Sequence, residues 1–212
     1  MTSPAADVTA FVNGYASPLP VDPMPEWVAS LRVSAEPVWI FAYGSLMWNP
    51  EMPFAERRPA LLRGYHRSFC LYSRDYRGTP ERPGLVLGLD RGGSCRGIAY
   101  RLPPEGLSAA IDRVWAREMA GQVYDMRSVH VATPQGKIAA YAFTVRRDNQ
   151  DYAGRLNSDE AARIIAAAVG GRGTGREYLA NTVRHLEELG IAEGPLHKIE
   201  ERVRALIAAG DS

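Results

Sequence analysis

The chain has 212 residues, 46% of them hydrophobic, and its formal net charge is +1. This length and composition suit one globular domain, and the near-neutral charge, with arginines scattered along the chain, argues against nucleic acid as a partner. No window approaches the ~18 apolar residues of a membrane-spanning helix, so we do not expect the chain to act at a membrane either.

The N-terminal segment differs in composition from the rest of the chain. Residues 1–24 are rich in Ala, Pro and Ser, and we expect residues 1–35 to form a loosely ordered extension, with a short helix near Glu26. A single domain is expected over residues 36–212. The segment lacks the basic and apolar regions of a signal peptide, and two cysteines, Cys70 and Cys95, are too few for a disulfide framework. A cytoplasmic location is therefore predicted.

Strand patterns dominate the first two-thirds of the domain. Residues 38–43 form an apolar run, and residues 60–73 are rich in strand-forming residues, with an irregularity expected at Gly64. A loop rich in Pro and Gly follows over residues 75–84. Residues 85–91 and 95–102 flank Gly-Gly-Ser and are predicted to form a hairpin, and a second hairpin is predicted over residues 127–145.

Helix patterns dominate the last third. One helix is expected earlier, after Pro103-Pro104, and three close the chain. The first of these begins at Asn157 or Ser158 and runs to Gly170-Gly171. The second begins with a capping box formed by Thr174 and Glu177 and ends at Gly190, and the third spans residues 193–210. Strands that precede clustered helices indicate an α+β fold rather than a doubly wound sheet.

Three apparent motifs are weak. The glycine-rich stretch 169–175 follows a helix and lacks Gly-Lys-Ser/Thr, so we interpret its glycines as a helix stop and a helix start rather than as a nucleotide site. Ser45 lacks the glycine two residues later that a nucleophile elbow needs, although a Ser45–His66 pair remains open. The four histidines show no metal-ligand spacing, so no metal is expected.

The most informative single residue is Glu118. On a helical wheel it falls within the apolar stripe of the helix after Pro104, while Arg117 is predicted to point elsewhere. A carboxylate on a buried face is costly unless it is paired, and burial raises its pKa toward the range of a general base. Periodicity alone does not separate this role from a carboxylate that reaches water or an arginine. Tyr124 and Tyr178 are further polar groups at the edge of the expected core.

Five stretches carry motifs of a known family: FAYGSLMWNP, RGYHRSFCLYSRDYRGTPERPGLVLGLDRGGSCRGIAYRL, VWAREM, DYAGRL and REYLANTVRHLEELGI. Together they cover about residues 36–208 and resemble the ChaC family of γ-glutamylcyclotransferases, in particular its bacterial branch. The resemblance implies a mixed fold built around a β-barrel-like sheet, with C-terminal helices. It also implies a lyase that needs no cofactor and cleaves glutathione to 5-oxoproline and Cys-Gly.

The resemblance assigns roles to particular residues. Glu118 stands where the family has its catalytic glutamate, which acts as general base and acid. Tyr43, Gly44, Ser45 and Leu46 match the turn that holds the γ-glutamyl group. Tyr124 and Tyr178 match tyrosines of the substrate pocket, although the sequence REMAGQVYDMR around Tyr124 departs from the form seen in other branches.

The part of the substrate beyond the γ-glutamyl group needs its own contacts. Arg77, in the loop after residue 74, is a candidate partner for the glycyl carboxylate of glutathione. Two other functions remain open at this point. The chain is either a cyclotransferase for another γ-glutamyl amine or a regulator that binds a γ-glutamyl metabolite without catalysis.

Overall fold

The computed structural model describes residues 11–12, 15–16 and 20–210. Its elements, in chain order, are β1 (Phe11–Val12), β2 (Tyr15–Ala16), α1 (Glu26–Ser30), η1 (Leu31–Val33), β3 (Trp39–Ala42), η2 (Ser45–Met47), β4 (Glu56–Ser73), β5 (Gly84–Arg101), α2 (Leu107–Glu118), β6 (Tyr124–Thr133), β7 (Gly136–Val145), α3 (Ser158–Ala167), β8 (Val169–Gly170), β9 (Gly173–Thr174), α4 (Gly175–Glu188) and α5 (Gly194–Gly210). The predicted α+β class is confirmed.

Five strands close into a barrel in the order β3-β5-β4-β6-β7. Neighbouring strands are antiparallel, except that β3 pairs parallel with β7 and so closes the barrel. The short strand β3 is buried along its whole length because its two faces pack against different cores. Trp39 and Phe41 face the barrel interior, while Ile40 and Ala42 join the larger core that includes α2 and the C-terminal helices.

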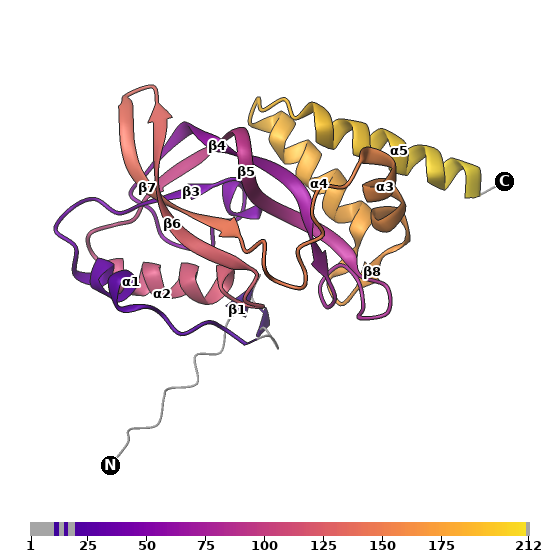
Figure 1. Ribbon diagram of the computed structural model, residues 1–212. Coiled ribbons are helices and arrows are strands. Elements are labelled where there is room, and N and C mark those ends of the chain that lie inside the picture. The colour runs from indigo at the N-terminus through magenta and orange to yellow at the C-terminus, as the bar shows by residue number, and fades with distance from the viewer. Residues whose placement is uncertain (1–10, 13–14, 17–19, 211–212) are drawn as a thin grey trace, which may run out of the picture.

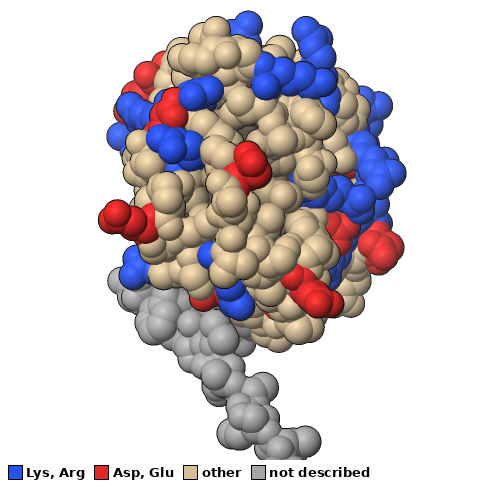
Figure 2. All heavy atoms as spheres, turned by 90° about the vertical axis from the view of Figure 1, so that its left-hand side faces the viewer, with Lys and Arg blue, Asp and Glu red and all other residues tan. Residues whose placement is uncertain are grey.

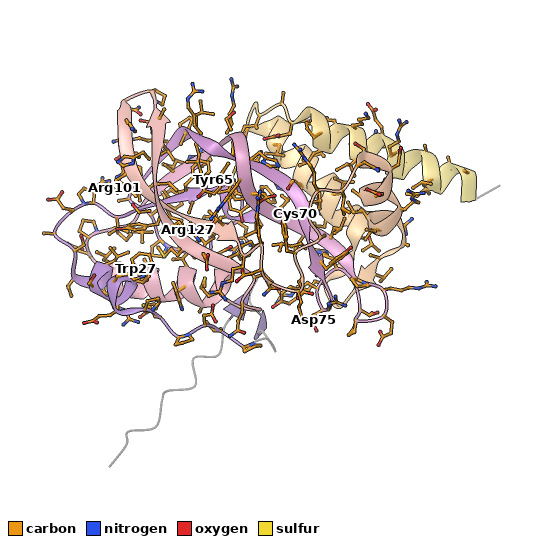
Figure 3. All side chains as sticks on the ribbon, viewed as in Figure 1. Trp27, Tyr65, Cys70, Asp75, Arg101 and Arg127 are labelled. Atoms are coloured by element: carbon orange, nitrogen blue, oxygen red, sulfur yellow. The ribbon has the colours of Figure 1, made fainter. Side chains whose placement is uncertain are left out.

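The longest strands, β4 and β5, form a ribbon that extends beyond the barrel (Figure 1). The helices α3, α4 and α5 gather on this extended half of the ribbon, while α1 and α2 lie against the barrel (Figure 1). Figure 3 labels Cys70 within the ribbon and Asp75 in the loop at its end. The ribbon therefore connects the barrel to the helical layer.

The prediction of a hairpin around Gly92-Gly93-Ser94 is wrong. Residues 84–101 form one strand that pairs with β4 on both sides of this point, and the register shifts where Gly64 lies opposite the two glycines. All three glycines have positive φ (86°, 104° and 67°), which places an irregularity in both strands. The irregularity at Gly64 was expected. The facing Gly92 and Gly93 in β5 are residues typical of a turn, but the chain does not reverse direction there.

The other local predictions agree more closely with the structure. The β6–β7 hairpin turns between Thr133 and Gly136, and both helix caps are formed as capping boxes, by Asn157 with Glu160 and by Thr174 with Glu177. The helix α3, however, ends at Ala167, because residues 169–174 form the two-stranded ribbon β8–β9. The glycines that were expected to end one helix and begin the next thus belong to a small two-stranded sheet.

The described part of the segment 1–35 includes residues 20–35, which contact the domain. Val28 of α1 is fully buried, and the carbonyl of Asp22 accepts a hydrogen bond of 2.9 Å from the indole of Trp115 on α2. The Asp22 carboxylate also forms an ion pair with Arg146. Residues 1–10, 13–14 and 17–19 lie outside the described residues, so the predicted boundary at residue 36 stays a prediction.

Surface charges on the face shown in Figure 2 carry both signs, as the near-neutral composition leads one to expect. Across the residues that the structure describes, no helix has the length and hydropathy needed to cross a bilayer.

Gly97 is the glycine on which barrel closure depends most directly. It lies in β5, and a Cβ atom at this position would stand 2.2 Å from the carbonyl oxygen of Ala42 in β3 and 2.9 Å from the ring of Phe41. We expect Gly97→Ala to lower the free energy of unfolding by about 1–3 kcal/mol, because a backbone atom cannot move aside cheaply. Urea denaturation measures the loss. Gly194→Ala, where a Cβ meets no atom within 4 Å, is the control and should stay close to the parent.

Candidate active site

The predicted site residues lie together. A small chamber of about 40 Å³ is lined by Tyr43, Gly44, Ser45, Leu46, Leu87, Glu118, Tyr124 and Tyr178. A larger cleft of about 540 Å³ shares Ser45, Glu118, Tyr124 and Tyr178 with it, and Arg77 lines that cleft. The chamber is thus the inner end of the cleft. All of the predicted site residues line the chamber except Arg77, which lines only the cleft.

The floor of the chamber is the turn after β3. The strand ends at Ala42, and η2 begins at Ser45, with the Met47 N–H donating to the Gly44 carbonyl at 2.8 Å. The first N–H groups of a helical turn have no partner within it, so those of Ser45 and Leu46 are left for other acceptors. A Cβ at Gly44 would make only ordinary contact, at 3.8 Å, with Leu87 of the chamber wall. Packing within the protein therefore does not require glycine at position 44. A ligand that approaches the backbone closely would require it.

Glu118 enters the chamber from the last residue of α2. Its side chain is 15% exposed, and the preceding apolar stripe, which includes Ile111 and Val114, is buried. Burial raises the pKa of Glu118 above its ordinary value, and the nearby guanidinium of Arg117 opposes the rise. Among the residues that line the chamber, Glu118 is the only carboxylate.

The prediction that Arg117 points away from the buried face that carries Glu118 is wrong. Its side chain is only 4% exposed and connects the end of α2 to the η2 segment. The guanidinium donates to the Ser45 hydroxyl at 3.0 Å and to the Asn49 carbonyl at 2.6 Å, and it lies 3.1 Å from a carboxylate oxygen of Glu118 and 3.2 Å from one of Glu51. Arg117 thereby fixes the catalytic candidate relative to the turn.

Three tyrosines complete the wall of the chamber. The Tyr124 hydroxyl donates to the Leu87 carbonyl at 2.8 Å, which places this residue in the chamber despite the departure of its surrounding sequence. Burial raises the pKa of Tyr43, Tyr124 and Tyr178, and the charge of Glu118 adds to the rise. All three are therefore neutral phenols near pH 7, able to donate hydrogen bonds but not to accept a proton from an ammonium group.

Arg77 lies at the junction of the cleft and the chamber. Its guanidinium lies 5.1 Å from the centre of the Tyr178 ring and donates to the Arg172 carbonyl at 2.5 Å. Because it is partly buried, the pKa of Arg77 is lowered from its ordinary value, but an arginine with this pKa shift remains cationic near pH 7. The cleft therefore places a fixed positive charge outside the chamber.

The β8–β9 segment holds Arg77 in place, a role that sequence reasoning missed. The N–H groups of Gly171 and Arg172 donate to the carbonyls of Asp75 and Tyr76 at 2.8 and 3.0 Å. A Cβ at Gly170 would stand 2.4 Å from the backbone nitrogen of Gly78, so glycine is needed for this close approach. The sequence offered one signal for this role. Glycines are concentrated both in residues 169–175, between two helices, and in the loop 75–84, as expected where two backbone segments approach closely.

The alternative of a Ser45–His66 pair does not fit the geometry. The Ser45 hydroxyl accepts a hydrogen bond from Arg117, which cannot take a proton. The Nδ1 atom of His66 lies 3.1 Å from the Gly92 carbonyl, and His66 lines a different cavity.

Comparisons with known proteins identify the family that this chain matches. The family model described as "ChaC-like protein" matches residues 38–206. The chain is 38% identical to the glutathione-specific gamma-glutamylcyclotransferase of Escherichia coli (strain K12), over 84% of this chain and 77% of that protein. It is 29% identical to gamma-glutamylcyclotransferase 2-3 of Arabidopsis thaliana, over 82% of this chain and 92% of that protein.

A solved structure shows the same fold. The crystal structure of the glutathione-specific gamma-glutamyl cyclotransferase from yeast superposes with a TM-score of 0.72 and 23% sequence identity, and the match covers 81% of this chain and 99% of that one. The barrel with its C-terminal helical layer is thus an arrangement that a crystal structure also shows.

Removing the cation next to Glu118 should raise the pKa of this carboxyl group further. In Arg117→Met the burial that raises the pKa remains, while the charge and the hydrogen bond that lower it are lost. A ¹³C NMR titration of the Glu118 side-chain carboxyl carbon measures the shift. Arg113→Met, on the exposed side of the same helix, is the matched control. An unchanged or lower pKa in Arg117→Met would contradict the role of this ion pair.

Proposed function

The chain belongs to the ChaC-like family, and from this membership together with the geometry of its chamber we propose that it is a glutathione-specific γ-glutamylcyclotransferase. It cleaves glutathione to 5-oxoproline and Cys-Gly. The observation that carries the proposal is the position of Glu118, the only carboxylate among the chamber-lining residues, next to the Tyr43–Leu46 turn.

The reaction is an intramolecular aminolysis. The α-amine of the γ-glutamyl group attacks its own γ-carbonyl carbon, a five-membered lactam forms, and the bond to the cysteinyl nitrogen breaks. Because nucleophile and electrophile belong to one molecule, the first task of the protein is to hold the chain in the reactive bend. A narrow chamber at the inner end of a wide cleft suits this task, since it admits the head group and leaves the rest of the substrate outside.

The second task is proton transfer. An α-amine titrates near roughly 8 and is mostly protonated, so it is not nucleophilic until it loses a proton. Two protons leave this nitrogen as it becomes the lactam N–H, and two arrive at the cysteinyl nitrogen as it becomes the ammonium group of Cys-Gly. We assign the transfer to Glu118, which accepts as a carboxylate and donates as a carboxylic acid. A pKa raised by burial suits both halves of this cycle.

The third task is to stabilise negative charge on the former γ-carbonyl oxygen. The N–H groups at the start of η2 are the proposed donors, since Ser45 and Leu46 line the chamber and their N–H groups have no partner inside the turn. The loss of one such donor typically costs about 3 kcal/mol in transition-state stabilisation. The neutral hydroxyls of Tyr43 and Tyr178 stay protonated beside the Glu118 carboxylate and add donors, whereas the Tyr124 hydroxyl already donates to the Leu87 carbonyl.

The proposed compartment is the cytoplasm. Cys70 and Cys95 are both free and buried, and burial raises the pKa of each thiol to about 11. Thiols in this state suit a reducing environment, where glutathione is also kept as the thiol.

Glu118→Gln should lower kcat for glutathione by about two to four orders of magnitude, because the amide keeps the size of the side chain and loses its basicity. Release of 5-oxoproline measures turnover, and thermal unfolding confirms that the variant is folded. In the parent, kcat should rise with pH as Glu118 ionises, with a midpoint above the ordinary range of a glutamate. Glu105→Gln, near the exposed start of the same helix, is the control. A folded Glu118→Gln protein with parental turnover would exclude the mechanism.

Arg77 is proposed to bind the glycyl carboxylate of the substrate. We therefore expect Arg77→Ala to raise KM for glutathione by about tenfold, the effect of one charge-assisted hydrogen bond, and to leave KM for a γ-glutamyl dipeptide that ends before the glycine nearly unchanged. Arg82→Ala, in the exposed part of the same loop, is the control. Equal effects on both substrates would count against this contact and favour another γ-glutamyl amine as the natural substrate, because the chamber itself would serve either.

A further inference from the structure

A second cavity lies between the β4–β5 ribbon and the helices α3 and α5. Its volume is about 520 Å³, close to that of the outer cleft. The floor is apolar and is formed by Phe69 of β4, Leu156, Ala161 of α3, and Leu196 and Ile199 of α5. Neither Glu118 nor any part of the Tyr43–Leu46 turn lines it, so it is distinct from the proposed catalytic site.

The mouth of this second cavity is cationic. Arg147 lies there in an ion pair of 2.7 Å with Asp90, the only carboxylate among the lining residues. Arg91 and Arg155 also line the cavity, and both side chains are exposed. Within the described ranges, neither arginine has a carboxylate at ion-pair distance. Two positive charges thus remain beside an apolar floor, an arrangement that suits a molecule with an apolar body and an anionic group.

Two residues of β4 separate the second cavity from the chamber, and both contact chamber residues. Arg67 is fully buried, forms an ion pair with Glu193 before α5, and donates to the carbonyl of Tyr43. Phe69 packs edge-on against the ring of Tyr178, with ring centres 5.9 Å apart. Residues 67 and 69 point to the same side of the strand. A ligand on the floor of the second cavity would therefore contact both side chains, and through them affect the contacts with Tyr43 and Tyr178.

The segment after β7 also joins the two sites. Asp151 lines the outer cleft and accepts a hydrogen bond of 2.7 Å from Arg74. The next residue, Tyr152, lines the second cavity and donates to Asp90 at 2.8 Å. A displacement of this short segment at one site therefore reaches the other within one residue.

We propose that the second cavity binds an amphipathic organic anion, a carboxylate or sulfonate on a compact apolar body, and that this binding changes turnover in the chamber. The regulatory half of the proposal rests on the proposed function, while the binding half stands alone. The effect requires that the ligand bind the arrangements of Arg67 and Phe69 with unequal affinity, because a ligand with equal affinity shifts no equilibrium.

Titration of the full chain with 8-anilinonaphthalene-1-sulfonate tests the site, because this probe combines both features and fluoresces in apolar surroundings. We expect one bound probe per chain by calorimetry. Its affinity should fall by about tenfold in Arg91→Ala/Arg155→Ala, which removes the two unpaired charges. Arg63→Ala/Arg163→Ala removes the same charge from exposed positions outside both cavities and should bind as the parent does. The uncharged N-phenyl-1-naphthylamine should bind more weakly, and inorganic phosphate should not displace the sulfonate.

Three outcomes would overturn the binding site. The first is equal affinity for the probe in both double variants. The second is a loss of affinity in Arg77→Ala instead, which would place the probe in the catalytic cleft. The third is displacement of the probe by phosphate alone, which would indicate a site for a small inorganic ion.

Turnover of glutathione with and without saturating probe tests the coupling. We expect kcat or KM of the parent to change by about fivefold or more, and the change to vanish in Arg91→Ala/Arg155→Ala, whose basal turnover should match the parent. Binding at the second cavity without any change in turnover would overturn the coupling. A parent that releases no 5-oxoproline at all would contradict the proposed function instead, since the fluorescence titration reports the second cavity by itself.

Discussion

The contact between Arg117 and Glu118 is the interaction on which the site depends. A carboxylate that is mostly buried is costly, and the end of a helix, where the backbone dipole is negative, adds to the cost. The neighbouring guanidinium offsets both while it also holds the Ser45 hydroxyl and the Asn49 carbonyl. A single buried side chain thus keeps the acid ionisable and fixes its distance from the turn. A lysine, with one compact charge in place of a planar fork, would not make these contacts together.

The chamber is built from elements that are far apart in the chain. The turn follows the first barrel strand, Leu87 and Tyr124 come from β5 and β6, Glu118 ends α2, and Tyr178 belongs to α4. The β4–β5 ribbon makes this possible, because one half of it lies in the barrel and the other half carries the C-terminal helices. The register shift opposite Gly64 separates the two halves. Site geometry therefore follows from the path of one long ribbon.

Local signals in the sequence were sufficient where structure is decided locally. The N-cap of α3, the capping box of α4, the β6–β7 hairpin and the apolar stripe of α2 are each specified by a few neighbouring residues, and each forms as predicted. The Gly-Gly-Ser stretch in β5 has the chemistry of a turn, and only pairing with residues about 30 positions earlier keeps it in a strand. Arg117 was misplaced for a related reason, since a helical wheel shows one buried face, whereas the end of α2 is also covered by the η2 segment. The residues of the chamber were identified through family resemblance, because periodicity alone does not bring Tyr43, Glu118 and Tyr178 together.

The parallel pairing of β3 with β7 has a consequence for biosynthesis. The turn that follows β3 is held by a strand that ends at Val145, and the wall supplied by α4 lies later still. Contacts between such distant segments form late in folding, because the intervening chain must first be ordered. A ribosome-bound chain that stops short of α4 lacks Tyr178 and hence one wall of the chamber. The chamber is therefore complete only in a chain that has folded as far as α4.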